Sequence, residues 1–446
     1  MTFTRRAVLA ASAAATVLPA AACATAPNAG GASPFVKVDG LGFVVNGRPY
    51  RFVGANMWYA AYLGADADYG NRARLTRELD TLAETGVTNI RLMASSEDSP
   101  LRNSVTPTFR NRTDTYNETL LEGLDLTLAE MGERDMKAIL CLTNFWEWSG
   151  GMMTYLYWVN GGQYLNMNDP AHPWPQFPDF NSAFYTQAEA QRLYRDYIRA
   201  VVTRTNTVTG VRYIDDPTIM SWQLANEPRP GGSDAIAAPN LPAFYAWIEG
   251  TAAYIKSLDP NHLVSTGSEG LKGCIERTDC VVATHEPASV DYLTAHIWPQ
   301  NWSWVDQRDL AATAEAGRPL VDKYIRDHIE IARGLNKPLV IEEFGYPRDG
   351  GLNDPSAPTT YKDRFYTQIF DAVLASIREG GPLVGSNFWA WNGEGRAAHP
   401  DHRFRPGDTS YVGDPPHEPQ GWYGVFDSDA STRALIRAHA AALAAT

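Results

Sequence analysis

Residues 219–229 read Ile-Met-Ser-Trp-Gln-Leu-Ala-Asn-Glu-Pro-Arg, an apolar run that stops at Glu227 and Pro228. The run predicts a buried strand over residues 219–225, and side-chain alternation places Glu227 on the same side as Gln223. Proline has no N–H to donate, so Pro228 ends the pairing there. A buried strand that leads into a carboxylate is typical of parallel barrels, in which polar side chains gather at the carboxyl ends of the strands. A solvated loop carboxylate is the other interpretation of Glu227.

Seven further apolar runs resemble this one, and amphipathic stretches of helical periodicity separate most of them. Eight strand-then-helix units after residue 34 predict an α/β protein, a single (β/α)8 TIM barrel with long loops at its C-terminal face. The expected strands are residues 51–56, 89–93, 138–143, 219–225, 263–267, 292–296, 338–343 and 384–389. The expected helices are residues 72–85, 117–133, 187–205, 242–258, 314–335, 361–378 and 431–444.

A doubly wound sheet is the structural alternative. A nucleotide-binding sheet of that kind carries a glycine-rich phosphate turn after its first strand, and residues 53–57 (Val-Gly-Ala-Asn-Met) contain one glycine. The chain has no internal repeat, and its amino-acid composition does not change abruptly along its length. Residues 34–446 are therefore expected to form one catalytic domain. Residues 35–49 predict an N-terminal β-hairpin that plugs the bottom of the barrel.

Charge and composition narrow the class of ligand. The chain has 446 residues, 38 Lys and Arg against 51 Asp and Glu, and a net charge of −13. This balance argues against nucleic acid and anionic lipid as partners, because both require a cationic surface. The 13 Trp and 21 Tyr suggest flat stacking surfaces in addition to a large core.

The first residues predict a targeting signal. Residues 1–23 are expected to be an export signal of the twin-arginine type, because Arg5 and Arg6 precede a short apolar stretch and a small-residue region. Cys23 stands where a lipoprotein signal places its acylated cysteine, although ordinary cleavage fits the same region. Residues 24–33 would form a flexible leader. The expected location is the periplasm, the outer membrane through a lipid anchor on Cys23, or the medium after secretion.

Export to an oxidising compartment changes how the remaining cysteines are interpreted. Cys274 and Cys280 lie six residues apart in a loop-like stretch and predict a local disulfide. Cys141 lies in an apolar run and is expected to be buried. No cysteine pair has the spacing of zinc ligands, so no metal is expected.

A second acidic strand end occurs in residues 337–346, Lys-Pro-Leu-Val-Ile-Glu-Glu-Phe-Gly-Tyr. Alternation by itself does not choose between Glu342 and Glu343, but Glu343 lies at the very edge, so Glu342 is expected on the opposite face in a structural role. Two carboxylates from separate strands that face one cleft are what glycoside hydrolysis requires. One protonates the leaving oxygen, and in retaining enzymes the other attacks the anomeric carbon from about 5–5.5 Å away.

Other strand ends support this chemistry. Arg91 is expected to face inward and keep a nearby carboxylate ionised, with a structural ion pair as the alternative. His296 and Trp298 share the inward face of another strand, and a buried structural histidine is the alternative there. Trp389 faces inward at the end of the last strand, Trp58 follows the first, and both are candidate platforms for sugar rings.

Together these residues resemble glycoside hydrolase family 5, in the clan of retaining (β/α)8 glycosidases, and especially its β-mannanase branch. The resemblance implies that Glu227, next to Asn226, is the acid/base and that Glu343 is the nucleophile. It also matches Arg91, His296 and Trp389 to the family's Arg, His and strand-eight Trp. Many members carry a Tyr hydroxyl against the nucleophile at the place of Trp298, and an indole N–H donates but cannot accept a hydrogen bond.

The leading hypothesis is therefore an endo-β-mannanase that cleaves β-1,4-mannosidic bonds by double displacement, with a polysaccharide as its partner and no cofactor or protein partner required. An exo-β-mannosidase is the nearest alternative, because the long segments 155–184 and 391–423 would turn a cleft into a pocket. A β-1,4-glucanase comes next. A non-catalytic carbohydrate-binding protein is disfavoured by the presence of both carboxylates, and an esterase by the absence of Gly-x-Ser-x-Gly. His399 and His402 indicate a polar loop turn rather than a metal site.

Overall fold

The structure is a computed structural model that describes residues 33–113 and 115–446. The predicted export signal, its Cys23 and the leader up to residue 32 lie outside the described residues. Within the part that is described, Ser33–Thr446 form one compact unit. None of its helices has the length and the apolar character needed to cross a bilayer.

Eight parallel strands form the central sheet, in the order β8-β7-β6-β5-β4-β11-β10-β9. All eight were predicted, each within two residues of its observed bounds. The strands are β4 (Phe52–Asn56), β5 (Asn89–Met93), β6 (Lys137–Cys141), β7 (Ile219–Gln223), β8 (Leu263–Ser265), β9 (Leu293–Ile297), β10 (Leu339–Phe344) and β11 (Leu383–Phe388).

The two ends of this sheet meet and close the barrel. Asp291 donates its backbone N–H to the carbonyl of Val264 at 2.8 Å, and His296 donates to the carbonyl of Glu269 at 3.2 Å. These bonds join the segments around β8 and β9, so the predicted (β/α)8 barrel is confirmed. Closure leaves no exposed sheet edge and aims the C-terminal ends of all strands at one mouth.

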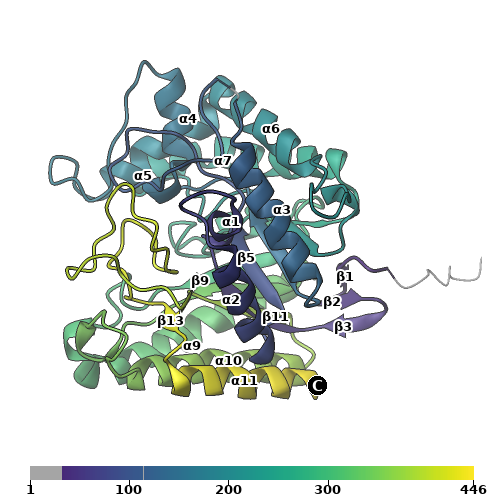
Figure 1. Ribbon diagram of the computed structural model, residues 1–446, viewed down its shortest axis with the longest axis vertical. Coiled ribbons are helices and arrows are strands. Elements are labelled where there is room, and N and C mark those ends of the chain that lie inside the picture. Colours follow the sequence, from purple (N-terminus) through teal and green to yellow (C-terminus); the bar gives the residue numbers. More distant parts are fainter. Residues whose placement is uncertain (1–32, 114) are drawn as a thin grey trace, which may run out of the picture. The chain divides into compact units, whose positions relative to one another are not determined.

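Helices surround the barrel (Figure 1). Asn71 and Asn117 start two of them by accepting backbone N–H groups from Arg74 and Leu120, as N-cap residues do. The long helices are α2 (Arg72–Glu84), α3 (Glu118–Gly132), α6 (Ala188–Val202), α7 (Asp234–Leu258), α9 (Leu310–Leu335), α10 (Thr360–Arg378) and α11 (Ala430–Ala444).

The largest difference between predicted and observed helix bounds occurs in α7. Helix α7 starts at Asp234, eight residues before its predicted start, because the helix continues through Pro239 and Pro242. Short helices such as α8 (Thr278–His285) were not predicted, since so few residues give too little periodicity to recognise.

A small antiparallel sheet covers the bottom of the barrel. It has three strands, β1 (Lys37–Asp39), β2 (Gly42–Val45) and β3 (Arg48–Tyr50), and so extends the predicted hairpin by one strand. Asn46 and Gly47 form the two-residue turn with φ of 51° and 72°, the left-handed conformation that such turns require. Phe43 on β2 is buried edge-on against Tyr292, with ring centroids 5.4 Å apart.

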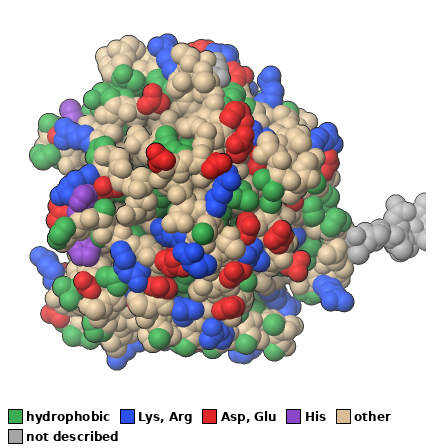
Figure 2. Space-filling model, in the orientation of Figure 1, with side chains coloured by type: hydrophobic (Ala, Val, Ile, Leu, Met, Phe, Trp, Pro, Cys, Tyr) green, Lys and Arg blue, Asp and Glu red, His purple; other side chains and the backbone are tan. Residues whose placement is uncertain are grey.

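The longest loops lie on the side opposite this small sheet (Figure 1). One follows β6 and contains α4 (Gly151–Val159) and α5 (Gln176–Asn181). The other runs between the short strands β12 (Trp391–Gly393) and β13 (Val425–Phe426). Acidic and basic side chains are intermixed over the face seen in Figure 2, and pairs such as Arg77 with Glu394 at 2.7 Å attach the second loop to a barrel helix.

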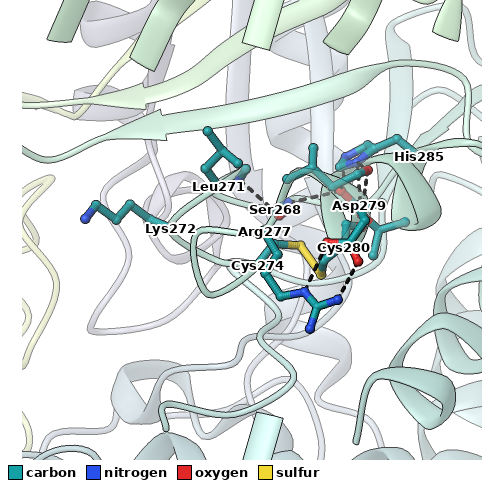
Figure 3. Close-up of a disulfide and its surroundings, with 12 residues drawn as sticks. Ser268, Leu271, Lys272, Cys274, Arg277, Asp279, Cys280 and His285 are labelled. Atoms are coloured by element: carbon teal, nitrogen blue, oxygen red, sulfur yellow. Dashed lines mark hydrogen bonds and ion pairs between the residues drawn. A yellow bond between two sulfur atoms is a disulfide. The ribbon is translucent and has the colours of Figure 1, made fainter. Parts of the chain in front are cut away.

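The predicted disulfide is present between Cys274, in the loop after β8, and Cys280 on α8 (Figure 3). Both residues are buried, and their Cα atoms are 5.6 Å apart. Cys141 is a buried free thiol on β6, as expected, and burial raises its pKa to about 12. The disulfide therefore secures the loop that carries Glu269, a residue of the barrel mouth.

Candidate active site

Glu227 stands just beyond β7 rather than on it. The strand ends at Gln223, and an isolated bridge between Asn144 and Asn226 carries the pairing with the neighbouring segment onward. Glu227 then adopts a left-handed φ of 52°, uncommon for a side chain of this kind, and donates its N–H to the carbonyl of Gly267 at 2.9 Å. The expected placement in the mouth is confirmed, but a turn rather than strand alternation produces it.

A bulge in β10 places two neighbouring glutamates inside the barrel. The register with β9 shifts between Ile341 and Glu343, and Glu343 pairs with His296. Glu342 was expected on the opposite face, and this expectation was wrong: its carboxylate accepts from Gln223 at 2.5 Å and from the hydroxyl of Tyr292 at 3.0 Å in the barrel interior. The extra residue of a bulge breaks the alternation on which the expectation depended. The structural role of Glu342 is as expected.

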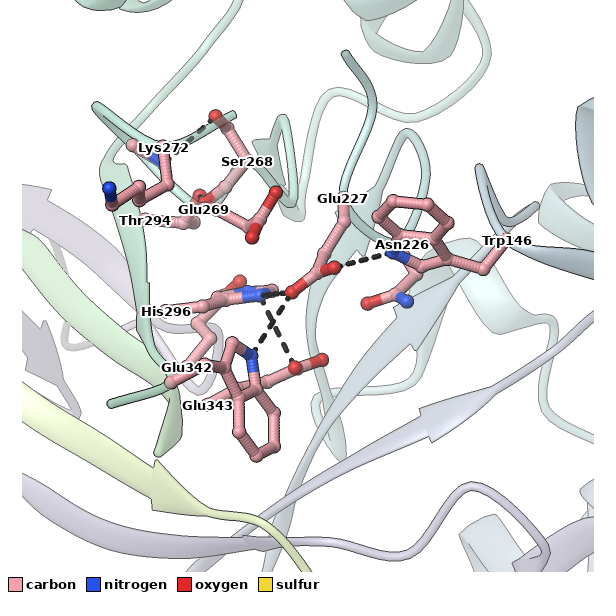
Figure 4. A network of polar contacts seen from close by, with 12 residues as sticks. Trp146, Asn226, Glu227, Ser268, Glu269, Lys272, Thr294, His296, Glu342 and Glu343 are labelled. Atoms are coloured by element: carbon pink, nitrogen blue, oxygen red, sulfur yellow. Dashed lines mark hydrogen bonds and ion pairs between the residues drawn. The ribbon is translucent and has the colours of Figure 1, made fainter. Parts of the chain in front are cut away.

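The two mouth carboxylates, Glu227 and Glu343, face each other across His296 (Figure 4). Nδ1 of His296 lies 2.6 Å from Oε1 of Glu227 and 3.3 Å from Oε2 of Glu343. Carboxylate oxygens of the two residues and a ring nitrogen of His296 all lie within 4.8 Å of one another. Glu227 is 6% exposed and Glu343 is 2% exposed, so water reaches them only narrowly.

Arg91 supplies the positive charge beneath this pair. Its Nη1 donates to Oε1 of Glu343 at 2.5 Å, and its other N–H groups donate to Asn56, Gln223 and Asn226 at 2.7–3.0 Å. Arg91 is 2% exposed, as the predicted inward orientation requires. A buried guanidinium that makes four hydrogen bonds is held rigidly against the carboxylate.

Burial dominates the ionisation of the site. It raises the pKa of Glu227 and raises that of Glu343 well above the usual range, and the charge of Glu227 adds to the second effect. Arg91 opposes the rise at Glu343 by attracting the carboxylate. Burial, together with the charge of Arg91, holds the pKa of His296 well below its usual value, so the ring is neutral.

Two indole groups donate hydrogen bonds to Glu227. Nε1 of Trp146 donates to Oε2 at 2.5 Å, and Nε1 of Trp298 donates to Oε1 at 3.3 Å. Trp298 therefore contacts Glu227. In many family members the Tyr at this place contacts the nucleophile, which here is Glu343. The bond of Asn226 with Arg91 ties the Asn-Glu pair to the charged centre.

The two predicted aromatic platforms lie beside this centre. Trp58 and Trp389 line a narrow hollow together with Asn56, Arg91, Trp148 and Asn226. Both rings are nearly buried, at 2% and 4% exposure, and the indole N–H of each has no protein acceptor. Trp58 is packed edge-on against four other aromatic rings. Neither ring therefore presents a broad open face for stacking, and each has a buried N–H without a protein acceptor.

Several residues of the site were not predicted. Trp146 comes from the loop after β6, and the Arg229–Glu269 ion pair joins the loops after β7 and β8 with two bonds of 2.6 and 2.7 Å. Burial raises the pKa of Glu269 to about 7. Position within four residues of a predicted strand end was a signal for Trp146, Arg229 and Glu269 alike.

Glu227, His296 and Glu343 are also the one group of possible metal ligands among residues 33–113 and 115–446. Arg91 already bonds Glu343, and His296 already bonds Glu227, so a cation would have to displace both contacts. His399 contacts Asp408 at 3.0 Å, and His402 contacts the carbonyl of Gln420 at 2.9 Å. These are contacts within a polar loop, as predicted.

The arrangement suits retaining glycoside hydrolysis. Two carboxylates from the ends of the fourth and seventh strands of a barrel both contact His296. An oxygen of one lies within 4.8 Å of an oxygen of the other, which is close enough for the spacing of about 5–5.5 Å in retaining enzymes. A family model described as "GH family 5 beta-mannosidase-like" matches residues 33–446. The chain belongs to this glycoside hydrolase family.

Relatives agree with this membership. The chain is 33% identical over 385 residues to mannan endo-1,4-beta-mannosidase 4 of Oryza sativa subsp. japonica, covering 82% of this chain and 74% of the relative. The glycoside hydrolase family 5 mannosidase of Rhizomucor miehei superposes with a TM-score of 0.84 at 35% identity, covering 92% and 98% of the two chains. The endo-1,4-beta-mannanase of the same organism superposes with a TM-score of 0.66 at 25% identity, covering 92% and 100%.

The indole bond to Glu227 has a measurable effect. In a Trp146→Phe variant the carboxylate loses a donor that lowers its pKa, so the pKa of Glu227 should rise. NMR titration of ¹³Cδ-labelled glutamate would follow this carboxyl, assigned with a Glu227→Gln variant. Trp158→Phe is the matched control, because that buried indole donates to the backbone of Asp98 instead. An unchanged or lower pKa in Trp146→Phe would contradict the role of this bond.

Proposed function

We propose that this family 5 glycoside hydrolase cleaves β-1,4-mannosidic bonds in mannans and mannooligosaccharides with retention of configuration. The observation that carries the mechanism is the buried Glu227–Glu343 pair with Arg91 on one member only. The names of the relatives support the choice of mannan, and the curated relatives support endo action.

In the first step Glu343 attacks the anomeric carbon while Glu227 protonates the leaving oxygen. Arg91 keeps the negative charge on Glu343, since its guanidinium contacts that carboxylate at 2.5 Å. Arg91 bonds Glu343 and not Glu227, so the proton shared by the two carboxylates is placed on Glu227, where the neutral ring of His296 at 2.6 Å can accept its hydrogen bond. The proposed products are a glycosyl-enzyme and the free aglycone.

In the second step Glu227, now ionised, takes a proton from water, and the resulting hydroxide-like oxygen displaces Glu343 from the sugar. The short carboxylate spacing requires that the aglycone leaves before water enters the same place. His296 contacts both carboxylates and stays neutral, so it orients them without adding charge.

Exo release of mannose is a second candidate, because one end of the mouth is covered. Tyr423, from the loop between β12 and β13, packs on Trp298 with ring centroids 5.0 Å apart and bonds Asn301 through its hydroxyl. Glu418 from the same loop has a buried oxygen without a protein partner. Likeness to the Rhizomucor miehei mannosidase structure supports the same candidate.

Products from mannan and from mannohexaose distinguish the candidates. We expect mixed short oligomers if the enzyme is endo-acting, and mannose as the sole early product if it is exo-acting. Chromatography of early time points measures this directly. Release from cellohexaose but not from mannohexaose would overturn the proposed substrate.

We further propose that the protein is exported. The disulfide between Cys274 and Cys280 supports this location, because such bonds persist in oxidising compartments. The stretch that begins with Arg5 and Arg6 would be the export signal.

Glu343→Ala tests the nucleophile. Turnover should fall on the order of 10⁵-fold, since no other group can form the covalent intermediate. Azide fits the space of the lost carboxylate and should restore part of the rate with activated aryl mannosides, giving a glycosyl azide of inverted configuration. Glu342→Gln is the neighbouring control and should form no azide product. Ordinary activity of Glu343→Ala without azide would remove it from this role.

Glu227→Ala tests the acid. Loss of a positioned proton donor costs roughly 10²–10⁴-fold for substrates with poor leaving groups. An aryl mannoside with an acidic phenol needs little protonation, so its glycosylation step should be affected far less. The ratio of kcat/KM for mannohexaose to that for the aryl mannoside measures the difference. Equal losses on both substrates would exclude Glu227 as the acid.

A further inference from the structure

One large aromatic side chain stands exposed at the rim of the mouth. Trp174, in the loop between α4 and α5, is 61% exposed, the highest value among the large hydrophobic side chains of the part of the chain that the structure describes. Exposing so much apolar ring to water is unfavourable, and the free face of an indole is suited to stacking against a ligand.

A single side chain, Trp146, lies between Trp174 and Glu227. Its ring stacks on that of Trp146, with centroids 6.3 Å apart and planes at 30°. Trp146 in turn bonds Oε2 of Glu227, whereas Oε1 faces His296 and Trp298 (Figure 4). The two indoles therefore extend from the side of Glu227 that points away from Glu343.

A fixed cation lies over both indoles. The guanidinium of Arg229 is 5.0 Å from the ring centre of Trp146 and 5.8 Å from that of Trp174. Glu269 holds Arg229 through two hydrogen bonds, so the guanidinium is not free to swing away. Cation–π attraction of this kind keeps an exposed indole in place.

The loop that carries Trp174 is anchored to the segment after Glu227. The carboxylate of Asp179, on α5, accepts the backbone N–H groups of Gly232 and Ser233 at 2.8 and 2.9 Å, and the hydroxyl of Ser233 at 2.7 Å. Phe177, also on α5, stacks on Trp146 at 6.1 Å with planes at 18°. The loop therefore presents Trp174 at a fixed distance from the reacting carboxyl.

We propose that Trp174 is a stacking platform for a sugar residue of the aglycone, one or more residues beyond the bond that is cleaved. This inference rests on the proposed function, in which Glu227 protonates the leaving oxygen, so that groups on its outer side face the leaving sugar chain. Pyranose rings present an apolar C–H face that fits an indole, and Arg229 offers N–H groups to the hydroxyls. The platform serves endo and exo cleavage alike, because both release an aglycone.

Trp174→Ala tests the platform. The ratio of kcat/KM for mannohexaose to that for an aryl β-mannoside should fall about ten-fold, mainly through KM, because only the long substrate reaches the ring. Trp174→Phe should restore most of the ratio, since it keeps a flat face. Val208→Ala, a similarly exposed side chain in the loop before β7, is the control and should leave the ratio unchanged.

Cleavage positions supply a second measurement. With mannohexaose labelled by ¹⁸O at its reducing end, Trp174→Ala should shift cleavage toward the bonds that place fewer sugars on the aglycone side. An unchanged ratio with an unchanged cleavage pattern would overturn the platform, as would equal losses on both substrates. Absence of turnover by the wild-type enzyme on any mannoside would instead overturn the proposed function, so the two failures are distinguishable.

Discussion

The buried guanidinium of Arg91 is the contact on which the rest of the site depends. A charge this deep is tolerated only when its partners replace the lost water. Here they come from four parts of the barrel: Asn56 on β4, Gln223 on β7, Asn226 just after β7, and Glu343 on β10. The same bonds that satisfy Arg91 fix the relative positions of these strand ends, so structural and chemical roles coincide in one residue.

Around this centre the barrel is layered. Below lies Glu342, bonded to Gln223 and Tyr292, and above lie Glu227 and Glu343 with neutral His296 between them. In the upper layer the indoles of Trp146 and Trp298, which lie on loops rather than strands, donate hydrogen bonds to Glu227. Strands thus supply the charged groups at fixed spacing, while loops supply the aromatic surfaces on which the choice and length of the sugar chain depend.

Much of this was predictable because strand ends in a parallel barrel all point to one mouth. Glu227, Glu343, Arg91 and His296 follow from that rule, and the structure brings them together. The predicted orientation of Glu342 was wrong because the pattern of apolar residues does not reveal the bulge in β10. Trp298 stands where many family members have a Tyr against the nucleophile, and it bonds Glu227, since side-chain torsions decide between acceptors that lie a few ångströms apart.

The amino-acid sequence by itself determined the number and order of the strands, the disulfide pair and the identity of the two acidic strand ends, because each depends on short-range periodicity or spacing. Tertiary structure alone decided how far apart the carboxylates lie, which of them Arg91 contacts, and that Trp146, Trp174, Arg229 and Glu269 belong to the mouth. Those features arise where segments distant along the chain pack together, and no local pattern encodes a distance between them.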